Sequence, residues 1–449
     1  MSLYRATALP SLDLDWLRQG VAGMLAGNRV VRRDGSGRAV RYHAPSLVPE
    51  PSLALRGRYP HQWFWDSCAH AVVLSHLDPE MARGELLGLL SAQDEQGFIP
   101  HQIFNTGKMH FLDRLLARFY PSRYGSPYLQ PPALAEAVEA VYRREPDLDF
   151  LRRVLPAVRR YYWYIRKTRV RGGDGLAEIV HSYESGKDRS REYDEVYGRP
   201  LGLGLRLAPL MRLMMQQRAL DWDLERIFSS NLFRVKDLLF NCVYARNLEV
   251  MSGLCRAASE QGQAQEFAAE SRRVEGAILE KMWDAEAGLF CSLDARGGVD
   301  RRLKVSTVSA FLPLMLSSTS EATVERLVEE HLGNPAEYWL EYPVPAEPLG
   351  SPEAGHRLTA IWRGLQTWMY PNWFIVRGLL RQARRFPRHA ERHVGMARHI
   401  TERSYELVRR SGFREYYHAR TGQGARARRF GSSALVLDMA YCIEGVTHG

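Results

Sequence analysis

The sequence predicts an all-α protein, an (α/α)6 barrel in which helical hairpins close into a ring with long active-site loops at one end. Apolar residues recur at helical spacing in about a dozen segments, most of them joined by short connections. No alternation of strands with helices and no strand-rich block is visible in the chain. About twelve helices pack most simply as six hairpins around one centre, with the functional residues on the connecting loops.

Individual segments carry clear helix signals. After Asp147 the apolar residues of 148–165 recur at spacings of three and four, which lines one face of a helix. Asp78 followed by Pro79 predicts a helix start, because Asp caps a helix and Pro fits its first turn. Further helices are expected near residues 12–25, 66–77, 131–144, 205–222, 235–260, 264–283, 306–317, 321–332, 366–383, 387–412 and 432–443.

Length and composition indicate one packed globular domain. The chain has 449 residues, of which 45% are hydrophobic and 10% aromatic, and this excludes a disordered protein. No linker rich in Pro, Gly or Ser divides it, so residues 1–449 are expected to form a single domain. We find no signal peptide and no apolar run of the roughly 20 residues that span a bilayer, and therefore expect a cytoplasmic location without membrane contact. Five widely spaced cysteines are expected to be reduced core residues.

The positive charge is a weak indicator of nucleic-acid binding. The chain carries 61 Lys and Arg against 51 Asp and Glu, a net charge of +10 that is spread along amphipathic segments. Such residues are typical of solvated helix faces, and an arginine-lined pocket for an anionic small molecule is the alternative. His389 and His393 have a spacing that suits a metal, but without a nearby third ligand an exposed helix face is expected. Neither a metal nor a cofactor is predicted.

Four connecting segments are rich in aromatic, amide and carboxylate side chains: residues 59–67, 97–102, 181–194 and 412–417. In the first, three aromatic residues precede Asp66, an arrangement that stacks on a sugar ring while the carboxylate accepts from its hydroxyl groups. The alternative is that Asp66 caps a helix and the tryptophans belong to the core. Hydrolysis of a glycosidic bond needs one carboxylic acid to protonate the leaving oxygen and a second carboxylate to activate water.

Seven motifs, in this order along the chain, resemble those of glycoside hydrolase family 63. They are Y-P-H-Q-W-F-W-D-S at 59–67, G-F-I-P-H-Q at 97–102, E-S-G-x-D at 184–188, V-x-D-x-x-F-N at 235–241, Y-P-V-P at 342–345, W-R-G at 362–364 and F-x-E-Y-Y at 413–417. Within the family, the chain most resembles the bacterial mannosylglycerate and glucosylglycerate hydrolases. Each motif alone is weakly specific, whereas the ordered set spans nearly the whole chain.

The resemblance implies an inverting, metal-independent α-glycosidase acting on a small carbohydrate, an α-glucoside or α-mannoside. Carried over by position, Asp188 matches the general acid and Glu415 the general base. The residues that match the sugar pocket are Tyr59, Trp63, Trp65, Asp66, His101, Gln130, Tyr183, Trp362, Arg363, Gly364 and Tyr416. Tyr183 stands where relatives commonly have Trp.

Three departures from the family pattern lie in predicted substrate-facing loops. Leu365 follows W-R-G where relatives usually have Pro, Arg191 stands at another usual Pro, and the usual S-W-T-A-A reads G-S-S-A-L at 431–435. Two alternatives therefore stay open: a sugar epimerase or lyase on the same fold, and a carbohydrate-binding protein with impaired catalysis. Any functional part of the positive charge is expected at Arg363, Lys187, Arg189 and Arg191.

Overall fold

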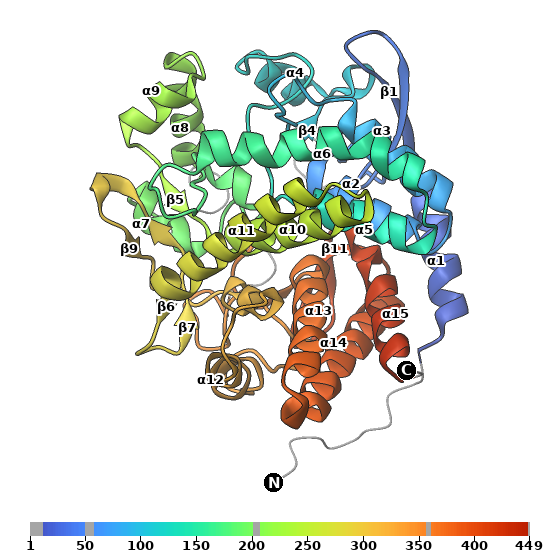
Figure 1. Ribbon diagram of the computed structural model, residues 1–449, viewed down its shortest axis with the longest axis vertical. Coiled ribbons are helices and arrows are strands. Elements are labelled where there is room, and N and C mark those ends of the chain that lie inside the picture. Colours follow the sequence, from blue (N-terminus) through green and yellow to red (C-terminus); the bar gives the residue numbers. More distant parts are fainter. Residues whose placement is uncertain (1–11, 50–57, 201–206, 356–360, 448–449) are drawn as a thin grey trace.

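Helices make up most of the described chain, as the apolar periodicity predicts (Figure 1). The computed structural model describes residues 12–49, 58–200, 207–355 and 361–447. Its α-helices are α1 (Leu14–Asn28), α2 (Phe64–Leu74), α3 (Pro79–Leu90), α4 (Phe111–Ala117), α5 (Leu134–Arg144), α6 (Leu148–Arg169), α7 (Asp194–Tyr197), α8 (Ala208–Ala219), α9 (Leu224–Ser230), α10 (Leu238–Ala257), α11 (Gln261–Ala277), α12 (Glu321–Arg326), α13 (Met369–Arg385), α14 (Ala390–Ser411) and α15 (Leu435–Thr447).

Strands are short and pair into small antiparallel sheets. They are β1 (Arg29–Arg33), β2 (Ala39–His43), β3 (Gln62–Trp63), β4 (Gln102–Ile103), β5 (Val235–Lys236), β6 (Trp283–Asp284), β7 (Leu289–Phe290), β8 (Leu293–Asp294), β9 (Arg301–Arg302), β10 (Gln366–Thr367), β11 (Arg414–His418) and β12 (Gly424–Arg428). The longest pairings are the hairpins β1–β2 and β11–β12. The sequence did not predict the hairpin β1–β2, because the three arginines of β1 obscure the alternating burial of that strand.

The helix starts form as their sequences predict. Asp78 accepts a hydrogen bond from the backbone N–H of Met81 at 2.9 Å, with Pro79 in the first turn of α3. In α6 the apolar face predicted from the spacing is buried, except that Leu148 at its beginning is exposed. The segment predicted as a helix over 306–317 is a 3-10 helix, η8 (Val308–Met315). It contains Pro313, which has no N–H to donate to an α-helical hydrogen bond.

Six elements close into an inner ring. α2 packs against α5 and α15, α10 packs against α5 and η8, and α13 packs against η8 and α15. Outside this ring each inner element has a partner that is close to it in sequence or in space. The pairs are α2 with α3, α5 with α6, α10 with α11, η8 with the π-helix η9 (Leu327–Leu332), α13 with α14, and α15 with α1.

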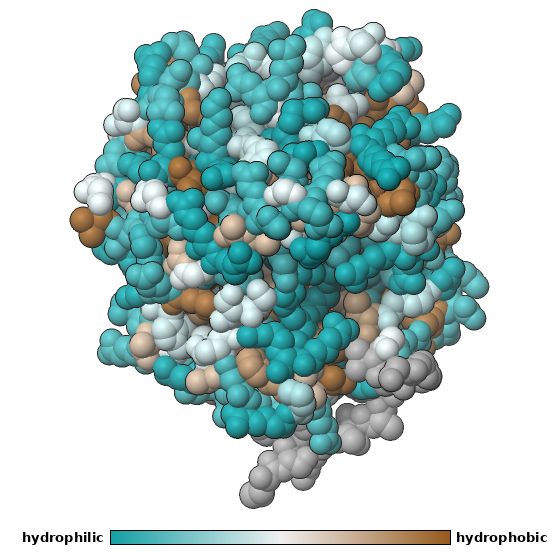
Figure 2. All heavy atoms as spheres, in the orientation of Figure 1, coloured by the Kyte–Doolittle hydropathy of each residue, from teal (hydrophilic) through white to brown (hydrophobic). Residues whose placement is uncertain are grey.

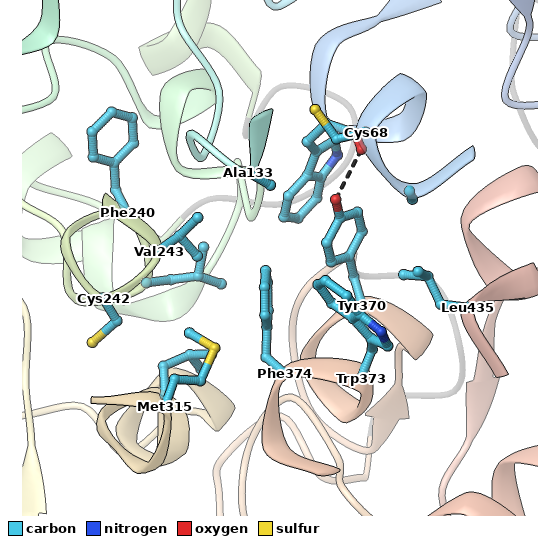
Figure 3. Packing of buried hydrophobic residues seen from close by; sticks show 14 of the residues in the cluster. Cys68, Ala133, Phe240, Cys242, Val243, Met315, Tyr370, Trp373, Phe374 and Leu435 are labelled. Carbon is cyan, nitrogen blue, oxygen red and sulfur yellow. Dashed lines mark hydrogen bonds between the residues drawn. The ribbon is translucent and has the colours of Figure 1, made fainter. Parts of the chain in front are cut away.

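An apolar layer fills the middle of the ring. Figure 3 shows Val243, Met315 and Phe374, from α10, η8 and α13, gathered about its centre, with Tyr370 donating to the carbonyl of Trp65 at 2.9 Å. The five cysteines are free, and all but the partly exposed Cys442 are buried, as expected for core residues. Hydrophilic side chains cover most of the face seen in Figure 2. None of the described helices combines the length and apolar character needed to cross a membrane.

Candidate active site

The predicted general base, Glu415, lies on β11 opposite an irregularity of the β11–β12 hairpin. The pairing slips by one residue here, so that both Arg426 and Ala427 of β12 face Glu415. Arg426 has a φ of 55°, in the left-handed region that β-branched and bulky residues rarely adopt. Bulges of this kind bend a strand and redirect a side chain, and they are frequent beside active sites.

The Glu415 carboxylate is almost completely buried, at 5% exposure, yet several donors surround it. The Arg426 Nε and the Ala427 N–H lie 3.4 and 3.3 Å from its Oε2, and the Tyr59 hydroxyl donates to Oε1 at 3.3 Å. Burial raises the pKa of Glu415, whereas Arg426, Ala427 and Tyr59 act in the opposite direction. These contacts suit a carboxylate that must be ionised to accept a proton from water.

Asp66 is a second buried carboxyl, and its charge is coupled to that of Glu415. Burial, and after it the charge of Glu415, raises the pKa of Asp66 to about 7. The helix α2 begins after Trp63, which holds the N-cap position without a side-chain capping bond. The alternative that Asp66 caps this helix is therefore wrong, because Asp66 lies inside the first turn.

Aromatic rings line one wall from Glu415 to the loop that carries the predicted acid. Tyr59 and Trp63 have ring centroids 6.2 Å apart, and Trp63 lies 5.2 Å from His101. His101 is in turn 6.2 Å from Tyr183, five residues before the acid. The structure thus brings together residues that the sequence places in three separate motifs.

A second aromatic wall faces the other side of Trp65. Trp65 lies 6.4 Å from Trp362, and Trp362 stacks in parallel on Trp368 at 3.9 Å. Trp368 continues this wall to Tyr416, at 4.8 Å. Trp368 was not among the predicted site residues. The Gln130 Oε1 accepts the backbone N–H of Trp65 at 3.0 Å, so this amide anchors the start of α2.

The loop of Asp188 is pressed against Trp65. Gly186 has a φ of 74°, and a Cβ atom at this position would lie 2.6 Å from the Trp65 indole, so only glycine permits the approach. Asp188 follows two residues later and is partly exposed. The charge of the adjacent Arg189 acts to lower the pKa of Tyr416, which burial raises. Through Trp65 and the aromatic wall from Trp362 to Tyr416, the loop of the predicted acid is connected to the strand of the predicted base.

Lys187, beside the predicted acid, points into a buried network. Its Nζ bonds Asp237 at 2.7 Å and the Tyr193 hydroxyl at 3.0 Å, and it also pairs with Glu192. Its charge is thereby compensated by two carboxylates of the protein. The network fixes the E-S-G-K-D loop to the beginning of α10.

Arg363 joins the W-R-G turn to the loop of the acid. The turn is unusual, since Trp362 and Gly364 both have positive φ, of 61° and 63°. The buried Arg363 side chain donates from Nε to the Arg189 carbonyl at 2.7 Å and pairs with Asp194. These bonds to Arg189 and Asp194 hold two loops together. The contact of Arg363 with the sugar stays a prediction.

Two departures from the family pattern have local explanations. After W-R-G, the Gln366 Oε1 accepts the backbone N–H of Trp362 at 3.0 Å, which supports the turn without a proline. Arg191 lies 3.4 Å from the fully buried carboxylate of Glu347. The residues at both departures thus make contacts that stabilise the loops of the candidate site.

The third departure begins at Gly431, which lies directly against His70 of α2. A Cβ atom at position 431 would overlap the imidazole Nε2 of His70. His70 is completely buried, and its Nδ1 lies 3.9 Å from the Glu85 carboxylate. Glycine is therefore the residue that this contact requires.

Metal ligands do not converge in the described part of the chain, where no group of three or more His, Cys, Asp or Glu has the geometry of a metal site. The exposed face expected for His389 and His393 is wrong for His393, which is buried. Both histidines approach the Glu325 carboxylate of α12, at 3.0 and 3.1 Å.

Comparison with known proteins identifies the family. Residues 59–433 match the family described as the mannosylglycerate hydrolase MGH1-like glycoside hydrolase domain, a span that contains both predicted catalytic carboxyls. The chain belongs to this family. As a glycoside hydrolase it is an enzyme, so the non-catalytic alternative and the epimerase or lyase alternative are set aside.

Relatives of this glycoside hydrolase cover most of its length. The mannosylglycerate hydrolase of Thermus thermophilus is 28% identical over 423 residues, which are 86% of this chain and 95% of that protein. The glucosylglycerate hydrolase of Mycolicibacterium hassiacum is 27% identical over 474 residues, covering 88% and 99%. The crystal structure of a family 63 mannosylglycerate hydrolase from Thermus thermophilus, in complex with Tris and D-glycerate, has a TM-score of 0.77 at 26% identity and covers 95% of this chain and 100% of that one. The resemblance to family 63 is confirmed.

Arg426 is the main site residue that sequence reasoning missed in this glycoside hydrolase. The available signal was the alternation in G-A-R-A-R at 424–428, which follows a turn and predicts a strand paired with 414–418. Such pairing places one arginine of the motif beside Glu415. The bulge that brings Arg426 there has no signal in the sequence.

Proposed function

We propose that this glycoside hydrolase cleaves an α-glucoside or α-mannoside of a small hydroxy acid such as glycerate, with inversion at the anomeric carbon. The names of its relatives, mannosylglycerate and glucosylglycerate hydrolases, support the substrate class. The observation that carries the proposal is the placement of Glu415. It is a buried carboxylate held by three donors, in a pocket walled by aromatic rings and reached by the loop of Asp188.

In the proposed reaction, Asp188 donates its proton to the glycosidic oxygen as the bond from that oxygen to the anomeric carbon breaks. A water molecule attacks the opposite face of the sugar and gives its proton to Glu415. The products are the free sugar, with its anomeric configuration inverted, and the hydroxy acid. The two carboxyls exchange protons with solvent before the next cycle.

Sugar binding is assigned to the pocket residues around these carboxyls. Trp65 and Trp362 offer flat apolar surfaces to the sugar ring, and Asp66 lies close enough to Glu415 to share its pocket and bind a sugar hydroxyl group. The same roles are implied by the positions of these residues in the family motifs.

The carboxylate of the aglycone is assigned to Arg189. Its Nε and Nη1 are buried, and no group in the described part of the chain accepts a hydrogen bond from them. A buried guanidinium with unpartnered donors suits an anionic group such as a carboxylate, to which it donates charge-assisted hydrogen bonds.

The architecture belongs to the same proposal. The inner ring of six elements, each with an outer partner, supports an (α/α)6 barrel that forms one domain over residues 1–449. The yeast neutral trehalase, at 15% identity and a TM-score of 0.60, shares this overall fold. The five free cysteines favour a reducing compartment, and hence a cytoplasmic location.

Two variants and two leaving groups test the catalytic assignment. On glucosylglycerate and mannosylglycerate, Asp188→Asn and Glu415→Gln should each lower kcat/KM by about 10²–10⁴, the usual contribution of a general acid or base. On the corresponding α-glycosyl fluoride, whose leaving group needs no proton, Asp188→Asn should retain most activity and Glu415→Gln should not. Glu95→Gln, at an exposed position, serves as the matched control.

The same assay distinguishes the ways in which the proposal fails. Near-wild-type turnover by either variant removes that residue from its role. Release of the α-anomer first, seen by proton NMR, contradicts inversion. Hydrolysis of trehalose or kojibiose with no release from either glycerate compound contradicts the substrate class and leaves the acid–base pair intact.

A further inference from the structure

A cavity of about 580 Å³ opens at the end of the ring opposite the candidate active site. Residues of α5 from its first to its last turn, the later turns of α13, the first half of α15, the middle of α10 and the residues just after α2 surround it. Six arginines line it: Arg143, Arg144, Arg246, Arg377, Arg381 and Arg384. We refer to it as the arginine cavity.

The apolar layer separates the arginine cavity from the candidate active site. Trp368, in the wall of the active site, immediately precedes α13, and Arg377 and Arg381 lie nine and thirteen residues further along the same helix. At 1.5 Å of rise per residue these arginines are about 13 and 20 Å away along the ring axis. Val243, Met315 and Phe374 belong to the apolar layer (Figure 3), and Met315 also belongs to the cavity lining.

Ion pairs account for part of the positive charge. Arg246 lies 3.4 Å from Glu136 and 2.7 Å from Glu249, and Arg377 lies 3.5 Å from Glu136. Arg381 pairs with Glu249 at 2.6 Å. The same few carboxylates are therefore shared among several arginines.

The remaining arginines leave an excess of positive charge at the cavity. Arg143 pairs with Glu139, whereas Arg144 contacts no carboxylate of the described residues and lies against the His76 Nδ1 and the Tyr441 ring. Arg384 has no ion pair or hydrogen bond with any residue in the described ranges. Including Asp438, four carboxylates face six guanidinium groups.

Helix ends explain only some of these arginines. Cations are favoured in the last turn of a helix, and Arg143, Arg144 and Arg384 lie in the last turns of α5 and α13. Arg246 and Arg377 lie in the middle of their helices, largely covered by their neighbours. Placing guanidinium groups there costs desolvation, which a bound anion offsets.

We propose that the arginine cavity is a second binding site, for a small phosphorylated compound that carries two or more negative charges. Guanidinium forks bind phosphate oxygens in bidentate fashion, and several arginines around one cavity can bind two phosphate groups at once. The cavity is large enough for such a ligand and is lined by ring elements whose opposite ends carry the sugar pocket. This proposal is independent of the substrate assigned above.

Calorimetric titration with inorganic pyrophosphate at low ionic strength tests the site, with inorganic phosphate as the singly phosphorylated comparison. The wild type should bind one pyrophosphate saturably and more tightly than phosphate. Arg381→Gln combined with Arg384→Gln should weaken binding at least tenfold. Arg152→Gln combined with Arg153→Gln, at exposed positions of α6, removes the same charge and should leave binding unchanged.

Two further variants keep the test decisive. Arg384→Gln alone removes an exposed side chain without a partner, so it should fold normally and still weaken binding. Arg189→Gln should bind pyrophosphate as the wild type does, since Arg189 lies at the other end of the ring. The proposal is overturned if the wild type shows no saturable binding, or if the α6 control or Arg189→Gln loses binding to the same extent as the cavity variants.

Discussion

Asp66 and Glu415 share one buried pocket in which two negative charges are costly. Burial, and after it the charge of Glu415, holds the pKa of Asp66 at about 7. Burial also raises the pKa of Glu415, against the opposing effect of Arg426 and the Ala427 N–H, and around neutral pH Asp66 is partly protonated. A hydroxyl group of the sugar can then accept from Asp66 or donate to it.

Asp66→Asn should stabilise the folded protein at pH 8. A carboxyl whose folded pKa is raised from 3.8 to about 7 stabilises the fold at low pH and loses that contribution as pH rises through 7. Three units of pKa correspond to about 4 kcal/mol, so the variant should unfold at a higher temperature at pH 8 and approach the wild type near pH 4. Thermal unfolding across pH measures this; a difference that does not change with pH contradicts it. Asp149→Asn, on an exposed surface, is the control.

Arg189→Gln should impair hydrolysis of substrates that carry a carboxylate more than hydrolysis of substrates that do not. If Arg189 binds the aglycone carboxylate, its loss should raise KM for glucosylglycerate or mannosylglycerate about tenfold or more, the value of a charge-assisted hydrogen bond. Hydrolysis of the α-glycosyl fluoride, which has no carboxylate, should change little. Equal losses on both substrates would contradict the assignment, because the fluoride offers no carboxylate to Arg189 and needs no proton from the neighbouring Asp188.

At the scale of elements, the loop over 184–188 takes its position from a buried ion network. Lys187 pairs with Glu192 and Asp237, while Gly186 rests against Trp65, so one side of the loop is fixed by charge and the other by packing. Asp188 lies between these anchors and the W-R-G turn. Its orientation thus depends in part on a buried ion network of Lys187, Glu192 and Asp237.

Lys187→Met should lower stability and displace the predicted acid. Removing the cation leaves two buried carboxylates without their partner, a loss of about 3–5 kcal/mol in comparable cases. Adding Asp237→Asn to this variant should recover part of the stability. Denaturant unfolding and the basic limb of the kcat/KM pH profile measure the two effects, with the exposed Lys167→Met as control. An unchanged free energy of unfolding would contradict the role of the network.

At the scale of the whole molecule, contacts between α15 and α2 close the ring. Asp438 of α15 bonds His76 at 2.7 Å and the Trp373 indole N–H at 2.6 Å, joining the last helix to α2 and α13. Elements from both ends of the chain therefore depend on one another. This arrangement favours a single cooperative unit.

Calorimetric unfolding should show one transition, and Asp438→Asn should shift all of it to lower temperature. The variant weakens the ring at the point where it closes, so no part of the chain should retain its original stability. Asp149→Asn should leave the transition in place. Two separate peaks, of which only one moves, would contradict a single domain.

Periodicity predicted the elements that pack on one face. α6 and α14 appeared within a few residues of their expected ranges, since long amphipathic helices repeat their signal over many turns. The shorter 3-10 and π segments were expected as α-helices, because a few residues cannot show how Pro313 or a wider turn changes the hydrogen bonding. The β1–β2 hairpin was missed because the arginines of β1 hide the alternation of buried and exposed residues.

Motif order predicted which residues surround the pocket, but not how they contact one another. Arg363 and Asp194 are 169 positions apart, and neither carries a local sign of their ion pair. The coupling of Asp66 with Glu415 likewise arises only once α2 and β11 are neighbours. These contacts follow from tertiary packing, which a single sequence does not record.

The contact of Gly431 with His70 constrains how this sequence can evolve. A side chain at position 431 cannot be accepted while the imidazole fills the space, so any route to the serine of the usual family pattern passes first through a smaller residue at position 70. If position 431 changes first, its new side chain overlaps the His70 imidazole and the variant is selected against. The two positions, 361 residues apart in the chain, are therefore expected to change in a fixed historical order, recoverable from reconstructed ancestors.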